Sequence, residues 1–259
     1  MFMELLTKNE YAYRRLHDDI LSGKLPSGSR LIVKDLVEEY QVSAMPVRNA
    51  IARLEELGLV YTAPHQGAWV SEMNLSDYFT FMVLRIEAEA LAAYLAAQNR
   101  DDSLIQELET LLHRMEIARD SNDYETYGRI NRKSHVLVCQ ACGNPTLIDH
   151  IDMLVSRTQL AVSLFSVIPK SSSESCEEHR DLVSALRNRD SHLSAAIIRY
   201  QRCRSNLGLI SSIQAGNANI QDNHLLWRAS STEAGRQCIE TFAPIFAAIK
   251  EQNDYSKLK

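Results

Sequence analysis

The sequence has no long apolar run. No stretch approaches the roughly 20 apolar residues that cross a bilayer, and the N-terminus has no signal-peptide pattern. Five cysteines are an odd number, which argues against a disulfide framework. Glycine, proline and serine are not in excess, and an apolar fraction of 45% is ordinary for a globular protein. We therefore expect a soluble, cytoplasmic protein without membrane contact, whose 259 residues suffice for two domains.

The most informative stretch is SAMPVRNAIARLEELGLVYTAPHQGAWV, residues 43–70. Ser43 is placed to cap a helix that has Pro46 in its first turn, where a missing N–H costs little. Apolar residues at helical spacing predict a buried face, and the opposite face holds small residues and a single forked cation. That second face suits a helix end entering a DNA major groove, and its residues are Ala44, Met45, Arg48, Asn49 and Ala52.

A hairpin follows this helix. Gly58 stops the helix, residues 59–61 read as a strand, residues 64–67 as a tight turn and residues 68–70 as a return strand. Upstream, residues 11–21 have a helical apolar rhythm, and residues 33–40 form a second short helix that turns into Ser43. Within about seventy residues this order predicts a winged helix-turn-helix, with three helices and a two-stranded wing. An ordinary helix–hairpin packing unit is the alternative for the hairpin segment alone.

This segment resembles the DNA-binding domain of the GntR family of bacterial transcription regulators. The matching pieces are LSGKLPSGSRL, VSAMPVRNAIARLEELGLV and HQGAWV, which cover nearly the whole N-terminal domain. Ala44 stands where many members have arginine, and Asn49 stands where glutamate is common. The resemblance therefore implies DNA binding, but the operator sequence of relatives does not carry over. The DNA-binding residues we expect are Lys34, Ser43, Ala44, Met45, Pro46, Arg48, Asn49, Arg53, His65 and Gly67.

The first 75 residues lack the excess of positive charge that is usual in DNA-binding domains. They contain eight Lys/Arg and ten Asp/Glu. Cations are instead placed locally, at Lys24, Arg30, Lys34, Arg48, Arg53 and, when protonated, His65. We expect few phosphate contacts, so specific binding would depend on dimer symmetry and base contacts.

From Ser76 onward the sequence predicts an all-α bundle. No strand pattern interrupts it, and a serine-rich loop at residues 171–175 separates its later helices. The expected helices are 77–98, 103–121, 124–141, 145–166, 177–187 and 191–205. The domains are therefore expected at residues 1–75 and 76–205, followed by a C-terminal extension, 206–259. In the extension we expect a polar connection over 206–223 and an amphipathic helix over 232–251, packed either on the bundle or on a second subunit.

Five polar residues fall on the inward faces of bundle helices. A buried charge needs a partner, and Glu89, one turn after Arg85, would supply one in a purely structural role. Together the five favour a polar cavity over scattered core hydrogen bonds. They are Arg85, Asn131, His135, His179 and Gln201, and we expect them to bind an effector.

The bundle resembles the FCD ligand-binding domain of the FadR-like subfamily. The matching pieces are VLRIEAEALAAYLAA, NRKSHVLVCQACGNPTLI and EEHRDLVSALRNRDSHLSAAIIRY. The resemblance implies a carboxylate effector at Arg85. It also implies a divalent metal held by one aspartate and three histidines, which fall on Asn131, His135, His179 and Gln201. Two of these four have lost their usual chemistry, so we expect no firm cofactor, with His135 and His179 the only metal candidates.

These features together predict a ligand-responsive transcription regulator. It would bind an inverted-repeat operator in double-stranded DNA as a homodimer, acting as a repressor that a small carboxylate releases. A metal-sensing regulator of the same fold is the first alternative. An enzyme is the second, but no paired carboxylates, nucleophile elbow or phosphate-binding glycine loop supports it. The single CxxC, Cys139 to Cys142, reads as structural thiols rather than a zinc or redox site.

Overall fold

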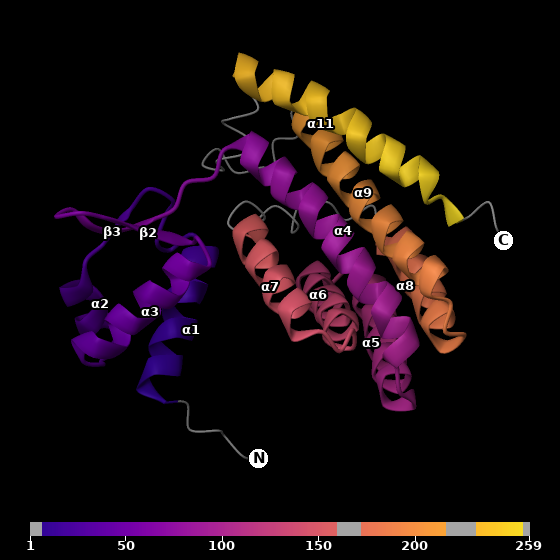
Figure 1. Ribbon diagram of the computed structural model, residues 1–259, viewed down its shortest axis with the longest axis horizontal. Helices are drawn as coiled ribbons and strands as arrows, with labels where there is room; N and C mark the ends of the chain where they lie inside the picture. Colours follow the sequence, from indigo (N-terminus) through magenta and orange to yellow (C-terminus); the bar gives the residue numbers. More distant parts are fainter. Residues whose placement is uncertain (1–6, 160–171, 216–231, 256–259) are drawn as a thin grey trace. The chain divides into compact units, whose positions relative to one another are not determined.

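The computed structural model describes residues 7–159, 172–215 and 232–255, which are mostly helical (Figure 1). Two compact units make up the chain. The first comprises Met1–Asn74 together with Val155–Ser163, and the second comprises Leu75–Leu154 and Leu164–Lys259. No helix in the described ranges is long and apolar enough to cross a membrane.

The first unit is built on three helices, α1 (Lys8–Leu21), α2 (Val33–Tyr40) and α3 (Ala44–Glu56). Thr7 caps α1 by accepting a hydrogen bond from the backbone N–H of Glu10. The apolar stripes of α1 and α3 pack on each other, and α2 packs on α3. Residues 33–40 and the helix after Ser43 are therefore helical as predicted.

The wing has three strands, not two. Strands β2 (Val60–Ala63) and β3 (Gly67–Val70) form the expected hairpin. Strand β1 (Arg30–Leu31) pairs antiparallel with the other side of β3, giving the order β1-β3-β2. A two-residue strand is too short to show an alternating pattern, so β1 could not be predicted from the sequence.

In the second unit the predicted all-α architecture is confirmed. Its described helices are α4 (Leu75–Asn99), α5 (Asp102–Asp120), α6 (Tyr124–Gln140), α7 (Pro145–Gln159, in this unit up to residue 154), α8 (Ser172–Arg187), α9 (Ser191–Gln214) and α11 (Glu233–Gln252). Helix α4 packs against α9, α6 and α8, while α5 packs against α6 and α8. The buried face of α4 runs through Met82, Ile86 and Ala93.

Two predicted connections are wrong where the structure describes them. Residues 172–175 begin α8 instead of forming a loop, and residues 206–214 extend α9 instead of leaving it. Serine is only mildly unfavourable in a helix, so packing against α5 and α9 outweighs local propensity in α8. The remainder of the expected fourth helix, residues 160–166, and of the expected polar connection, residues 216–223, lie outside the described residues.

The C-terminal helix packs on its own bundle. Figure 1 shows α11 running alongside α9 and the start of α4. Phe246 is fully buried and meets Phe79 of α4 edge-on, with ring centroids 5.7 Å apart. Farther along, Tyr255 packs on Tyr200 of α9 with centroids 5.4 Å apart. We expected this helix to pack either on the bundle or on a second subunit, and in the described residues it packs on the bundle.

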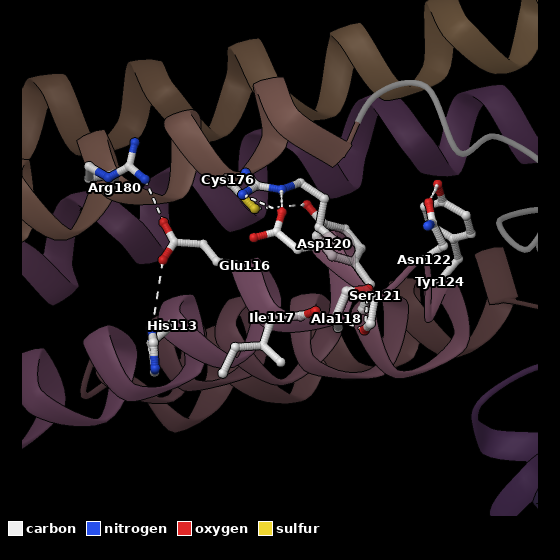
Figure 2. A network of polar contacts seen from close by, with 12 residues as sticks. His113, Glu116, Ile117, Ala118, Asp120, Ser121, Asn122, Tyr124, Cys176 and Arg180 are labelled. Carbon is white, nitrogen blue, oxygen red and sulfur yellow. Dashed lines mark hydrogen bonds and ion pairs between the residues drawn. The ribbon is translucent and has the colours of Figure 1, made fainter.

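Ion pairs fix α8 against α5. Figure 2 shows Glu116 of α5 between His113 and Arg180, with Arg180 of α8 donating to it at 2.5 Å. Arg187 of α8 also pairs with Glu109 of α5. The buried thiol of Cys176 lies 3.8 Å from the Tyr127 hydroxyl of α6. These contacts set the position of α8, which carries His179.

Candidate DNA interface and candidate effector site

The exposed face of α3 is the one that the sequence predicts. Ala44, Met45, Arg48 and Asn49 are exposed, while Val47, Ala50, Ile51 and Leu54 are buried on the other side. Met45 is 66% exposed, although large apolar side chains usually avoid water. The helix therefore presents an apolar side chain and a guanidinium next to its N-terminus.

Two expected members of this interface behave differently. Pro46 is buried with the core face of α3, so it shapes the helix start and does not lie on the exposed surface. The proline ring lacks an N–H and is apolar, which explains why it turns inward. Ser43 holds the N-cap position in an extended conformation, but its hydroxyl makes no capping hydrogen bond. The expectation that the Ser43 hydroxyl accepts a hydrogen bond from a backbone N–H of the first turn is therefore wrong.

Some cations of the first unit form ion pairs with carboxylates of the same unit, and others do not. Lys24 pairs with Asp19 at 3.0 Å and with Glu39, so it is tied to the domain's own carboxylates. Arg53 pairs with Glu10 at 3.0 Å and lies over the Tyr13 ring, 3.6 Å from its centroid.

The charged groups of Arg48 and Lys34 are not neutralised by described residues. Both are exposed, and neither forms a hydrogen bond or ion pair with another residue in the described part of the chain. Asn49 has a weak contact to Asn9, with Nδ2 and Oδ1 3.5 Å apart. Of the polar side chains on the exposed face of α3, Arg48 is thus the one with a free guanidinium.

The wing tip has an unusual backbone. His65 has φ = 62° and Gly67 has φ = 86°, while the N–H of Gln66 donates to the carbonyl of Ala63 at 3.0 Å. A histidine in the left-handed region is uncommon, and it leaves the exposed imidazole at the turn. Next to the tip, the Arg30 guanidinium lies 5.9 Å from the Trp69 ring centroid. A Cβ added to Gly67 would lie 3.6 Å from Nε of Arg30.

The second unit buries a charged triad. Glu89 of α4 is 2% exposed and accepts from Nε of Arg85 at 2.6 Å and from Nε of Arg202 at 2.6 Å. The two guanidinium groups hold the pKa of the Glu89 carboxyl below its ordinary value although burial opposes them. Burial lowers the pKa of Arg202 despite the attraction of Glu89, so this cation is under-compensated. The structural pairing of Arg85 with Glu89 is therefore present.

The sequence pattern does not predict that Arg202 faces inward and pairs with Glu89. It lies in the charged stretch RYQRCR, where alternating cations read as a solvated face. Its partner is 113 positions away on another helix, so no local pattern reveals the contact. The available signal was its position one turn after the apolar Ile198 on the same helix.

Next to the triad lie the remaining expected effector residues. The rings of His135 (α6) and His179 (α8) are edge to face, with centroids 5.1 Å apart. Nε2 of Gln201 (α9) lies 3.3 Å from Nδ1 of His179. Asn131 is one turn before His135 on α6. The fold thus gathers side chains from four helices, as predicted for these positions.

Both histidines are buried and neutral. Burial, together with the nearby charge of Arg202, lowers the pKa of His179 to about 4. Burial also lowers the pKa of His135 well below its ordinary value, with Arg202, His179 and Arg85 acting in the same direction. Because Arg202 influences both rings, the triad and the histidines form one electrostatic unit, which we call the buried polar cluster (Arg85, Glu89, Asn131, His135, His179, Gln201 and Arg202).

The residues of this cluster do not fit a divalent metal. Metal sites of this kind need anionic or imidazole ligands, whereas Asn131 and Gln201 offer neutral amide oxygens. Glu89 is already bound by two guanidinium groups. In the part of the chain that the structure describes, no group of three His, Cys, Asp or Glu side chains is placed to hold a metal.

The two cysteines of the CxxC sequence, Cys139 and Cys142, are buried, free thiols. Burial raises the pKa of the Cys139 thiol, and the nearby Glu89 charge raises it further. A thiol held neutral is a poor nucleophile and a poor metal ligand.

Comparisons with known proteins identify both units. The model of the bacterial regulatory proteins of the gntR family matches residues 8–70, and the FCD domain model matches residues 81–201. The transcriptional regulator McbR of Escherichia coli K12 is 30% identical over 170 residues, which are 65% of this chain and 77% of McbR. The repressor RspR of the same organism is 28% identical over 183 residues, covering 70% of this chain and 80% of RspR.

Structural similarity agrees with these matches. The solved structure of E. coli McbR superposes with a TM-score of 0.68 at 26% identity, over 79% of this chain and 97% of that one. These relatives are transcription regulators and not enzymes. The chain therefore belongs to the GntR family of bacterial DNA-binding transcription regulators, with an FCD domain as its second unit.

Proposed function

We propose that this regulator is a cytoplasmic repressor that binds an inverted-repeat operator as a homodimer and is released by a small carboxylate. The observation that carries the proposal is the exposed, unpaired guanidinium of Arg48 on α3, within the segment that matches the GntR DNA-binding model. Arginine recognises guanine by two parallel hydrogen bonds in the major groove. Two such helices, one from each protomer, would read two half-sites.

The rest of the DNA interface would surround Arg48. Ser43, Ala44, Met45 and Asn49 would face the groove beside it. Lys34, Arg53, His65 and Gly67 would contact the DNA backbone or the minor groove. Ala44 and Met45 would add apolar contacts, such as those made with thymine methyl groups. Pro46 is excluded from this set because it is buried.

The effector would enter the buried polar cluster. Arg85, Asn131, His135, His179 and Gln201 would line its site, and an anionic group would offset the under-compensated charge of Arg202. The effector would change DNA affinity only by binding the two dimer arrangements with different affinities. RspR is named a repressor, which supports repression here as the mode of control.

The test is a genome-wide selection of bound fragments, followed by anisotropy titration of a selected duplex. The wild-type protein should enrich short inverted repeats and bind them as a dimer by light scattering. Arg48→Ala should weaken this preference and keep its helical circular dichroism. Arg14→Ala is the matched control, because Arg14 is an exposed cation of the same unit paired with Glu10. No enrichment of any sequence by the wild type would contradict the proposal.

A further inference from the structure

The buried polar cluster contains polar atoms that lack partners. Asn131 Oδ1, His179 Nε2 and Gln201 Oε1 are all buried, and none has a hydrogen-bond partner among the described residues. His179 is 5% exposed and Gln201 is 4% exposed, so bulk water does not satisfy them freely. A buried polar atom without a partner destabilises the fold, which makes three in one cluster a sign of a missing ligand.

The hydrogen-bonding character of these atoms can be assigned. Nδ1 of His179 lies 2.8 Å from the carbonyl oxygen of Ser175 and therefore bears the hydrogen. Nε2 of His179 then has a lone pair and needs a donor. The Gln201 amide faces Nδ1 at 3.3 Å, and whichever way it is turned one of its polar atoms stays unpaired. The ligand must therefore donate to His179 and either donate to or accept from Gln201.

The positive charge of the cluster limits which ligand group can donate the hydrogen bond to His179. Arg202 and Arg85 both lower the pKa of His135, and Arg202 also lowers that of His179, so the rings lie in a positive potential. That potential disfavours an ammonium group for the same reason that it disfavours a metal ion. A hydroxyl group is neutral, and it both donates and accepts.

We propose that the effector is a hydroxycarboxylate that binds without a metal ion. Its carboxylate lies against Arg202, one hydroxyl donates to Nε2 of His179, and hydroxyl oxygens and hydrogens satisfy Gln201 and Asn131. This inference rests on the proposed effector role of the cluster.

The first experiment is a thermal-shift screen in the presence of EDTA. Each hydroxycarboxylate in the library, from lactate and glycerate to malate, tartrate and the aldonates, is matched with its deoxy and amino analogues. At least one hydroxycarboxylate should raise the melting temperature, and calorimetry should show at least tenfold weaker binding of its deoxy and amino analogues. The proposal fails if no hydroxycarboxylate binds, if an analogue binds equally well, or if binding requires added Zn²⁺, Mn²⁺ or Ni²⁺.

Variants test the individual atoms. Gln201→Met keeps the size and removes an unsatisfied amide, so the unliganded protein should melt at a higher temperature while affinity for the selected hydroxycarboxylate falls at least tenfold. Arg202→Gln should also weaken binding at least tenfold. The control is Arg199→Gln on the same helix, whose exposed partner is Glu87, and it should bind normally. A Gln201→Met protein that melts lower and binds normally would remove Gln201 from the site.

The two levels of proposal fail separately. If the protein selects no sequence from genomic DNA, the proposed function fails. If it selects an operator but none of the matched acids binds, only the hydroxycarboxylate inference fails.

A second inference concerns the wing and rests on different residues. Arg30 is exposed, lies against the Trp69 ring and has no ion pair with a described residue. The Arg30 guanidinium lies beside the wing tip, because a Cβ added to Gly67 would be in ordinary van der Waals contact with it at 3.6 Å. The aromatic ring holds the guanidinium in place without neutralising it. We infer that Arg30 is the phosphate contact of the wing.

Salt dependence of binding to a random-sequence duplex tests this role without knowledge of the operator. Loss of one phosphate contact should reduce the slope of log K against log salt by about 0.9. Arg30→Gln should show this reduction, whereas Arg14→Gln, with the same change in charge, should keep the wild-type slope. An unchanged slope in Arg30→Gln with retained circular dichroism would overturn the inference.

Discussion

The two units of the chain place their charged groups differently. In the first unit Arg48 is exposed and has no ion pair with a described residue, and the carboxylates of Asp19 and Glu10 bind other cations. In the second unit Glu89 is buried and binds both Arg85 and Arg202, whose side chains are 13% and 15% exposed. The first unit thus keeps a charge available on the exposed face of α3, whereas the charges inside the helical bundle are held by partners.

The largest test of this contrast is Glu89→Gln. Removing the carboxylate leaves two buried guanidinium groups without their shared partner, so we expect a loss of about 3–5 kcal/mol in the free energy of unfolding. Urea denaturation measures it. Glu87→Gln on the same helix removes a carboxylate that is 50% exposed and paired with Arg199, and should cost less than about 1 kcal/mol. An equal loss of unfolding free energy in the two variants would show that burial does not make the Glu89 carboxylate more important than the exposed one.

The next test uses pH. The pKa of His179 is about 4 in the folded protein and about 6.5 in the unfolded chain. Below pH 6.5 the unfolded state therefore takes up the proton first, and stability falls as the pH decreases towards 4. We expect this one residue to account for about 2–3 kcal/mol between pH 7 and 4.5.

His179→Gln should flatten that pH dependence in denaturant titrations at the two pH values. Part of the dependence should remain because the pKa of His135 is lowered in the same sense. His113→Gln is the control, since the His113 side chain is 75% exposed. A profile unchanged by His179→Gln would mean that this imidazole is not kept neutral by burial.

A smaller effect is expected at the DNA surface. Arg48→Ala should cost about 1–3 kcal/mol of binding free energy, or roughly 5- to 150-fold in operator affinity, with no change in melting temperature. Anisotropy titration of the selected duplex measures it. A variant that binds the operator normally would show that Arg48 does not read a base.

Arg53→Ala gives the smallest expected effect and sharpens the contrast within one helix. Its guanidinium is held by Glu10 and the Tyr13 ring, so its loss should reduce stability by about 0.5–1 kcal/mol. It should reduce operator affinity less than Arg48→Ala does. Melting temperature and anisotropy together separate the two arginines, and a larger affinity loss at Arg53 would reverse their assigned roles.

Local patterns predicted most of the first unit. The proline in the first turn of α3, the stop at Gly58 and the turn ending at Gly67 are short-range signals, and the helices and the hairpin follow them. The third strand was missed because β1 depends on a pairing between Leu31 and Ala68, far apart in the sequence. The inward position of Pro46 does not follow from its place in the first turn, because that place depends on the backbone whereas burial depends on the apolar ring.

The second unit shows where periodicity stops being informative. It located the inward positions of His135, His179 and Gln201, because each repeats with apolar neighbours on its helix. It did not show that Arg202 shares Glu89 with Arg85, since the two arginines are on different helices. Helix ends were least predictable where serine-rich or polar residues are stabilised by packing, as at Ser172 and beyond Ser205.

The position of β3 has a consequence for association between molecules. It is the middle strand of its sheet and is hydrogen-bonded on both sides. The outer strands, β1 with two residues and β2 with four, offer little backbone to a neighbouring chain. Short outer strands are a common protection against edge-to-edge aggregation, so the wing can project from the domain without becoming a template for it.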